Sequence, residues 1–233
     1  MESLRRVRVE RTFTREEMNE RRGILVLPRL YAILDAEYIP DRDAQFRVAR
    51  ELAAAGVTLI QYRNKTGSPS EILDQAQALR QGLPGEITLI LNDRADLCLA
   101  AGFNGVHVGQ GDLSPAAARQ LIGPDRCLGV STHNPEQVRE ADGTAADYIA
   151  IGPIFATRSK ANPDPVVGLD GIRRARELTR KPLVAIGGIT RENCRLVIDA
   201  GADSVAVISD LLGGSSGSPR AAAEHFLRLF VSA

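Results

Sequence analysis

Short apolar runs alternate with segments of helical spacing from Leu30 onward. The apolar runs are rich in Val, Ile and Leu, which is typical of strands buried on both faces of a parallel sheet. Between the runs, apolar residues recur every three or four positions, as at Val48, Leu52 and Ala55, and this spacing predicts helices that cover the sheet. The pattern predicts strands over residues 30–35, 58–64, 88–93, 105–110, 127–133, 147–155, 182–189 and 204–210.

Glycine and proline positions support these boundaries. Ser114-Pro115 and Asn134-Pro135 each place a capping side chain before a proline, which predicts the start of a helix. Other glycines stand where a helix should give way to a strand, and a positive φ there is accessible to glycine at little cost. These are Gly56, Gly82, Gly102, Gly123, Gly143 and Gly201.

Two architectures accommodate repeated βα units, a closed barrel and an open doubly wound sheet. Eight candidate strands favour a single-domain α/β fold, the (β/α)8 TIM barrel, over residues 30–233. A dinucleotide-binding sheet should carry G-x-G-x-x-G directly after its first strand. That strand ends instead in Leu34-Asp-Ala-Glu37, which argues against the open sheet. Residues 1–29 form an N-terminal extension whose role the sequence does not reveal.

Charge and cysteine content narrow the class of protein. Lys plus Arg equals Asp plus Glu at 29 each in the 233 residues, so no net charge attracts nucleic acid or an anionic membrane. No apolar run approaches the roughly 20 residues that span a bilayer, and the start of the chain lacks the apolar stretch of a signal peptide. Three widely separated cysteines, Cys98, Cys127 and Cys194, are typical of reduced thiols in a cytoplasmic protein.

Polar residues collect where the predicted strands end, which is where such barrels place their active sites. In Gln61-Tyr-Arg-Asn-Lys65, strand alternation puts Gln61, Arg63 and Lys65 on one face and Tyr62 and Asn64 on the other. Two cations beside an amide suit a diphosphate ester attached to a polar ring. A solvated strand end with ion pairs at the rim explains the same residues equally well.

Two aspartates follow neighbouring strands, Asp93 after the third and Asp112 just beyond the fourth. Two hard carboxylates with few other protein ligands suit Mg²⁺ shared with substrate phosphates and water. The alternative is that one carboxylate caps a helix and the other binds a turn amide.

The histidines offer no evident acid or base. His107 lies inside a strand between valines and is better interpreted as an interior residue with satisfied hydrogen bonds, while His133 and His225 have no evident partner. Ser131 is a candidate hydrogen-bonding residue, but no G-x-S-x-G elbow marks it as a nucleophile.

The last three strands supply candidate phosphate ligands. The sixth is followed by Thr157, Arg158, Ser159 and Lys160, in a connection long enough to act as a lid. Gly187-Gly188 ends the seventh strand, and Ile208-Ser209 ends the eighth. The loops after these two strands form the recurrent phosphate site of this fold.

As a set, these stretches resemble the thiamine phosphate synthase family. The resemblance runs from about Leu30 to the end of the chain and keeps the order and spacing of the family's motifs. The matching pieces are Gln61-Tyr-Arg-Asn-Lys65, Asn92-Asp-Arg94, Gly105-Val-His-Val-Gly-Gln110 with Asp112, Gly129-Val-Ser131, Gly152-Pro-Ile-Phe-Ala-Thr-Arg-Ser-Lys160, Ala185-Ile-Gly-Gly-Ile189 and Ile208-Ser209.

The resemblance implies a transferase that joins 4-amino-2-methyl-5-(diphosphooxymethyl)pyrimidine to a thiazole phosphate and releases diphosphate. It implies that Gln61 to Lys65, Asn92, Ser131 and Lys160 hold the pyrimidine diphosphate, and that Arg63, Lys65, Lys160 and Ser131 assist its departure. Asp93 and Asp112 would bind Mg²⁺, and the thiazole phosphate would contact Thr157 to Ser159, Gly188, Ile208 and Ser209. The partners are small molecules, and a homo-oligomer is compatible with the sequence.

Three alternatives remain. A related thiazole tautomerase would need an acid or base and has no use for a diphosphate–Mg²⁺ site. A sugar-phosphate or indole-phosphate isomerase would share the phosphate loops but would not explain the two aspartates. A non-catalytic binder that keeps the phosphate pocket would bind without turnover.

Overall fold

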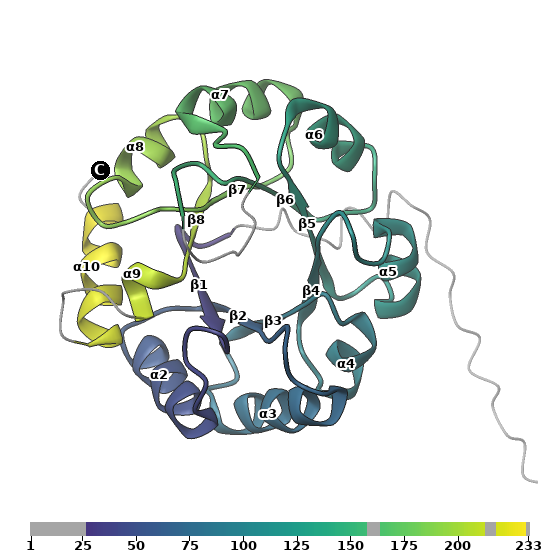
Figure 1. Ribbon diagram of the computed structural model, residues 1–233, viewed down its shortest axis with the longest axis vertical. Coiled ribbons are helices and arrows are strands. Elements are labelled where there is room, and N and C mark those ends of the chain that lie inside the picture. Colours follow the sequence, from purple (N-terminus) through teal and green to yellow (C-terminus); the bar gives the residue numbers. More distant parts are fainter. Residues whose placement is uncertain (1–26, 158–163, 213–217, 232–233) are drawn as a thin grey trace, which may run out of the picture.

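Eight parallel strands close on themselves, each hydrogen-bonded to the next and β8 to β1 (Figure 1). The computed structural model describes residues 27–157, 164–212 and 218–231. The strands are β1 (Leu30–Asp35), β2 (Leu59–Arg63), β3 (Thr88–Asn92), β4 (Gly105–Val108), β5 (Cys127–Thr132), β6 (Tyr148–Ile151), β7 (Leu183–Ile186) and β8 (Ser204–Val207). The predicted (β/α)8 barrel is therefore confirmed.

A ring of helices covers the outside of the barrel (Figure 1). Among the described residues it contains α2 (Arg42–Ala54), α3 (Pro69–Gly82), α4 (Ala95–Ala100), α5 (Pro115–Ile122), α6 (Pro135–Asp142), α7 (Gly168–Leu178), α8 (Cys194–Asp199), α9 (Ser209–Leu212) and α10 (Pro219–Val231). In the same parts of the chain, no helix has both the length and the apolar character needed to cross a membrane.

The predicted helix starts are confirmed by their caps. The Ser114 side chain accepts from the Ala117 amide, and the Asn134 side chain accepts from the Gln137 amide, each with proline in the first turn. Gly56, Gly102, Gly123 and Gly201 have positive φ, as expected.

The prediction of positive φ is wrong for two glycines. Gly143 has a φ of −74° and closes α6 in an ordinary right-handed conformation. Gly82 is the last residue of α3, and it is small for a packing reason. A Cβ at Gly82 would lie 2.2 Å from the ring of Phe46.

Seven of the eight strands are shorter than their apolar runs predicted, and β6, β7 and β8 end three or four residues early. β6 stops at Ile151 because Pro153 has no amide to donate to a ladder. β7 stops at Ile186, because Gly187 and Gly188 follow with φ of 100° and 63°. After β8, the amides of Leu211 and Leu212 donate to the Ile208 carbonyl, so the run continues as helix α9.

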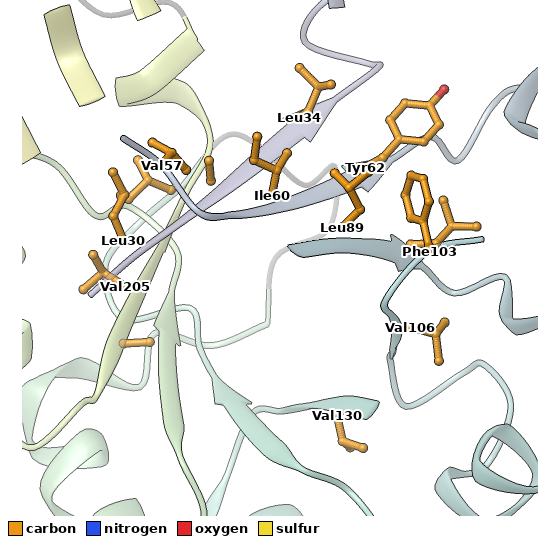
Figure 2. Close-up of a cluster of buried hydrophobic side chains, with 14 of the residues drawn as sticks. Leu30, Leu34, Val57, Ile60, Tyr62, Leu89, Phe103, Val106, Val130 and Val205 are labelled. Carbon is orange, nitrogen blue, oxygen red and sulfur yellow. The ribbon is translucent and has the colours of Figure 1, made fainter. Parts of the chain in front are cut away.

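Alternation along the strands divides the core into two layers. Outward residues such as Leu34, Ile60 and Tyr62 pack against the helices in one continuous cluster, part of which Figure 2 shows. Inward residues form a smaller cluster inside the barrel, with Tyr31 and Tyr148 as its largest members. Because the inner layer also includes small residues such as Ala150 and Ala206, the barrel interior is not filled by bulky side chains alone.

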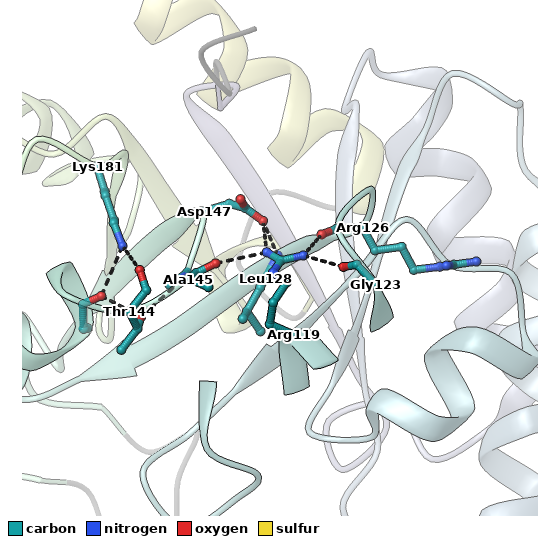
Figure 3. A network of polar contacts seen from close by, with 10 residues as sticks. Arg119, Gly123, Arg126, Leu128, Thr144, Ala145, Asp147 and Lys181 are labelled. Carbon is teal, nitrogen blue, oxygen red and sulfur yellow. Dashed lines mark hydrogen bonds and ion pairs between the residues drawn. The ribbon is translucent and has the colours of Figure 1, made fainter. Parts of the chain in front are cut away.

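A polar clamp ties together the amino ends of β5 and β6 (Figure 3). The Arg119 guanidinium donates to the carbonyls of Gly123, Arg126 and Ala145 at 2.9, 2.6 and 3.1 Å and to Asp147 Oδ2 at 2.6 Å. The same carboxylate accepts the Leu128 amide at 2.7 Å. This end of the barrel is thus crosslinked by contacts that have no part in lining the cavity at the opposite end.

Arg119→Ala is expected to lower the free energy of unfolding by about 2–4 kcal/mol, because it removes the charged partner of Asp147 and the donor to three carbonyls in a poorly solvated place. Urea denaturation measures the loss. The control is Arg47→Ala, which breaks an exposed pair with Asp41 and should cost less than about 0.5 kcal/mol. Similar losses in both variants would contradict a special role for the clamp.

Candidate active site

The carboxyl ends of the strands surround a cavity of about 450 Å³. Most of the predicted site residues within the described part of the chain line it. They are Gln61, Arg63, Lys65, Asn92, Asp93, Asp112, Ser131, Thr157, Gly188, Ile208 and Ser209. Arg158, Ser159 and Lys160 lie outside the described residues.

The two faces of β2 separate as its alternation predicts. Gln61, Arg63 and Lys65 face the cavity. Tyr62 lies in the outer core, and its hydroxyl accepts from Asn64 Nδ2 at 3.1 Å. The Asn64 side-chain oxygen accepts the amides of the following turn. The expected substrate contacts of Tyr62 and Asn64 are therefore corrected, because strand alternation directs both side chains away from the cavity.

Each cation at the end of β2 is paired with a carboxylate. Arg63 Nη1 lies 2.7 Å from Asp35 Oδ2 and 3.4 Å from Glu37 Oε2, and Lys65 Nζ lies 3.1 Å from Asp93 Oδ2. Burial raises the pKa of Asp35, although the Arg63 charge acts in the opposite direction. Sequence interpretation missed Asp35 and Glu37, although their position at the end of β1 was a usable signal.

Asp93 and Asp112 meet across the loops after β3 and β4. Burial, followed by hydrogen bonding and charge repulsion from Asp112, raises the pKa of Asp93 to about 6, with Lys65 acting against the shift. Asp112 Oδ2 also accepts the Gly109 amide at 2.8 Å, which fixes its orientation. Asp93 has a φ of 62° and is the only non-glycine residue with positive φ among those described.

The carboxylates of Asp93 and Asp112 are held close together although they repel each other. Such a pair fits a hard divalent cation whose other ligands are water and oxygen atoms of the substrate. No group of three His, Cys, Asp or Glu side chains is gathered for a metal in the described part of the chain, so the protein would supply these two carboxylates. The strained backbone of Asp93 is consistent with a functional constraint at this residue.

Asn92 adds an unused donor to the cavity. Its Nδ2 atom is buried without a hydrogen-bond partner among the described residues. A buried donor without a partner costs about 1–3 kcal/mol, and such groups usually mark a place where a ligand or water completes the bond.

A buried network crosses the inside of the barrel. His107 Nδ1 lies 2.9 Å from the Tyr148 hydroxyl, and His107 Nε2 lies 2.8 Å from Ser131 Oγ. The Tyr148 hydroxyl lies 3.0 Å from that of Tyr31, which accepts from Gln61 Nε2 at 2.8 Å. The interpretation of His107 as a satisfied interior residue is confirmed. The sequence did not single out Tyr31 or Tyr148, because each stands within an apolar run and carries no polar pattern of its own.

His133 does have partners, contrary to expectation. Its Nδ1 lies 2.6 Å from the Gly152 carbonyl, and its Nε2 lies 3.5 Å from Asp164 Oδ2. These contacts join the end of β5 to segments that follow β6, which lie close because β5 and β6 are paired strands. His225, on α10, is not part of the cavity lining.

The backbone at the end of β7 approaches the segment after β6 closely. A Cβ at Gly188 would lie 2.6 Å from the Ala156 carbonyl oxygen, so only glycine fits there without a shift. Thr157, Gly188, Ile208 and Ser209 thereby line one side of the cavity, opposite the aspartates of β3 and β4. This arrangement separates the predicted phosphate side from the predicted metal side.

Together, the closed barrel and its charged cavity define a (β/α)8-barrel protein whose site, at the carboxyl ends of the strands, suits phosphorylated ligands. Residues 30–211 match the family described as thiamine monophosphate synthase. The chain belongs to this family.

Individual relatives agree with the family match. The chain is 63% identical over 211 residues to a thiamine-phosphate synthase of Koribacter versatilis, which covers 89% of this chain and 98% of the relative. It is 44% identical to a thiamine-phosphate synthase of Shouchella clausii, over 79% and 88% of the two chains. A solved thiamine phosphate pyrophosphorylase from Pyrococcus furiosus superposes with a TM-score of 0.77 at 32% identity, covering 88% of this chain and 96% of that one.

The His107 ring is expected to stay neutral from about pH 5.5 to about pH 8, because burial lowers its pKa to about 4 and the ordinary value is about 6.5. Nitrogen chemical shifts of labelled histidine measure the charge of the ring. The same protein unfolded in urea is the control, since its histidines should titrate normally. A His107 signal that titrates near pH 6.5 in the folded protein would contradict the burial argument.

Proposed function

We propose that the cavity joins an aminopyrimidine carrying a diphosphooxymethyl group to a thiazole phosphate, giving thiamine phosphate and diphosphate. The bond between the methylene carbon and the diphosphate oxygen breaks, and a bond from that carbon to the thiazole nitrogen forms. The observation that carries the proposal is the pair Asp93 and Asp112, held in contact beside Lys65. Family membership supports the same reaction.

The proposed cofactor is Mg²⁺, held by Asp93 and Asp112. When bound, it neutralises charge on the diphosphate leaving group. The fit is supported by the two carboxylates, whose mutual repulsion a divalent cation would relieve.

The other residues on the metal side of the cavity are proposed to act on the pyrimidine diphosphate. Departure of diphosphate requires stabilisation of developing negative charge more than it requires a base. Lys65 and Arg63, with Lys160 from the segment after β6, are proposed to supply that field, and Ser131 to donate a hydrogen bond. Gln61 and Asn92 are proposed to orient the substrate, because their polar atoms line the cavity.

The thiazole phosphate is proposed to occupy the opposite side of the cavity. Its contacts would be Thr157, Gly188, Ile208 and Ser209, together with Arg158 and Ser159. The phosphate loops of this fold follow the last two strands, which supports the assignment. Two ligands on opposite sides of one cavity would bring the thiazole nitrogen toward the methylene carbon.

The alternatives explain less of the cavity. A thiazole tautomerase or an isomerase of phosphorylated sugars has no use for paired aspartates beside Lys65. A binder without turnover would use the same carboxylates for a metal and a diphosphate, and product formation separates it from the synthase. The proposed synthase reaction uses all of these groups. A relative named thiamine-phosphate synthase and a solved thiamine phosphate pyrophosphorylase align with this chain over 98% and 96% of their own lengths.

We also propose that the enzyme works in the reducing cytoplasm on small molecules, with neither nucleic acid nor membrane as a partner. None of the three cysteines, all of which the structure describes, takes part in a disulfide bond, and the formal net charge is zero. Assembly into a homo-oligomer is compatible with these features.

Asp93→Ala is expected to lower product formation at least about 100-fold, because it removes half of the proposed metal site beside the leaving group. The measurement is coupled diphosphate release and thiamine phosphate formation, with and without Mg²⁺. Asp96→Ala is the control, since Asp96 lies three residues after Asp93 and forms an exposed pair with Arg94. Calorimetry of inorganic diphosphate with Mg²⁺ gives a second readout, independent of turnover.

Two results would contradict the proposal. One is product formation that needs no divalent cation and survives Asp93→Ala. The other is the absence of product from the wild type while thiazole phosphate still binds, which would favour the tautomerase or the non-catalytic binder.

Lys65→Met is expected to lower kcat about 10²–10³-fold while the fold is retained, because it keeps the aliphatic stem and removes the charge aimed at the departing diphosphate. Steady-state kinetics with saturating substrates measures the change. Arg94→Met, which removes an exposed cation from the neighbouring loop, should leave kcat within about twofold. Equal effects of the two substitutions would refute a specific role for Lys65.

A further inference from the structure

The polar chain inside the barrel links two groups of the cavity that lie on different strands. It runs from Gln61 on β2 through Tyr31 on β1, Tyr148 on β6 and His107 on β4 to Ser131 on β5, with successive distances of 2.8, 3.0, 2.9 and 2.8 Å. Tyr31 and Tyr148 are 1% exposed and His107 is 7% exposed. The three central members therefore have little solvent with which to exchange hydrogen bonds.

The space for this chain is made by a glycine. A Cβ at Gly129 would lie 2.1 Å from Tyr148 Cζ and 2.4 Å from His107 Nδ1, where the two side chains meet. The rings of His107 and Tyr148 are stacked with centroids 5.5 Å apart, and those of Tyr31 and Tyr148 pack edge to face at 6.1 Å. Packing thus holds the hydroxyls and the imidazole in hydrogen-bonding positions.

The chain has a direction. Gln61 Nε2 can only donate, so the Tyr31 hydroxyl accepts from it and directs its own hydrogen to Tyr148. Tyr148 then donates to His107 Nδ1. Burial lowers the pKa of His107 to about 4, and a neutral imidazole that accepts at Nδ1 would carry its single hydrogen on Nε2 and donate it to Ser131 Oγ.

Ser131 stands at the end of this sequence of donations. Its oxygen already accepts from His107, so its own hydrogen is free to be donated into the cavity. At the other end, the amide nitrogen of Gln61 is engaged and its oxygen is left as an acceptor. In the reverse direction, Ser131 would donate to His107 and present lone pairs to an anionic substrate, which would repel it.

We propose that Tyr31, Tyr148 and His107 are positioning residues that orient the Ser131 hydroxyl as a donor to an anionic oxygen of the pyrimidine diphosphate. They act through Ser131 and touch no reacting atom. This inference rests on the proposed function for the identity of the ligand, while the direction of the chain is a property of the protein alone.

The first test is the tautomer of His107 in the wild-type protein. The chain contains three histidines, so a long-range proton–nitrogen spectrum of histidine-labelled protein can be assigned with His133→Gln and His225→Gln. The expected result is a neutral ring with hydrogen on Nε2. A ring with hydrogen on Nδ1 would reverse the chain and overturn the proposal.

The second test is Tyr148→Phe, which interrupts the chain and keeps the ring. The KM for the pyrimidine diphosphate is expected to rise about tenfold, equivalent to about 1.4 kcal/mol, while the KM for the thiazole phosphate changes less than about twofold. The same substitution in a Ser131→Ala background should have no further effect on the KM for the pyrimidine diphosphate, because the chain acts through Ser131.

The matched control is Thr132→Val. Thr132 is buried beside Ser131 on β5, but its hydroxyl donates to the Ala150 carbonyl at 2.8 Å and does not line the cavity. It reports what loss of a buried hydroxyl does to stability alone. A Tyr148→Phe effect no larger than that of Thr132→Val, or one that persists in the Ser131→Ala background, would overturn the proposal.

A failure of the proposed function would be distinguishable from a failure of the positioning role. If the wild type forms no product, calorimetry of inorganic diphosphate with Mg²⁺ replaces the kinetic readout. A weaker affinity in Tyr148→Phe, lost in the Ser131→Ala background, would then support the positioning role, and an unchanged affinity would overturn it.

Discussion

Closure of the parallel sheet is the constraint on which the site depends. The register of β8 against β1 pairs Leu30 with Val205 and Ala32 with Val207, which completes the ring of backbone hydrogen bonds. Since side chains alternate along a strand, a closed ring sends every second residue inward and leaves no free edge. All carboxyl ends then face one cavity, and residues from strands far apart in the sequence become neighbours.

The cavity concentrates charge in a protein that has no formal net charge. Arg63 is paired with Asp35 and Lys65 with Asp93, so the cations are held in place by carboxylates before any substrate binds. Asp93 lies against Asp112 in a partly buried place, and its backbone has a strained, positive φ. Charges arranged in this way are preorganised, which gives them more effect on a departing anion than solvated charges would have.

The interior of the barrel has a second role beyond packing. Small residues such as Gly129 and Ala150 leave room for the tyrosines and the histidine that join the cavity walls. The side-chain polar atoms of Tyr31, Tyr148 and His107 all have partners, so these three residues can remain buried without a large desolvation cost. At the other end of the barrel, separate contacts such as the Arg119 clamp hold the strands together.

The sequence by itself determined the barrel, the position of its strands, the capped helix starts and most of the cavity-lining residues. It did so because apolar periodicity, proline and strand-end polarity are local signals. Only the tertiary structure decided that His133 contacts Gly152 and that Tyr31, Tyr148 and His107 form one chain. The first contact depends on β5 and β6 lying side by side, and the chain depends on which inward positions meet inside the closed barrel; no local pattern encodes either proximity.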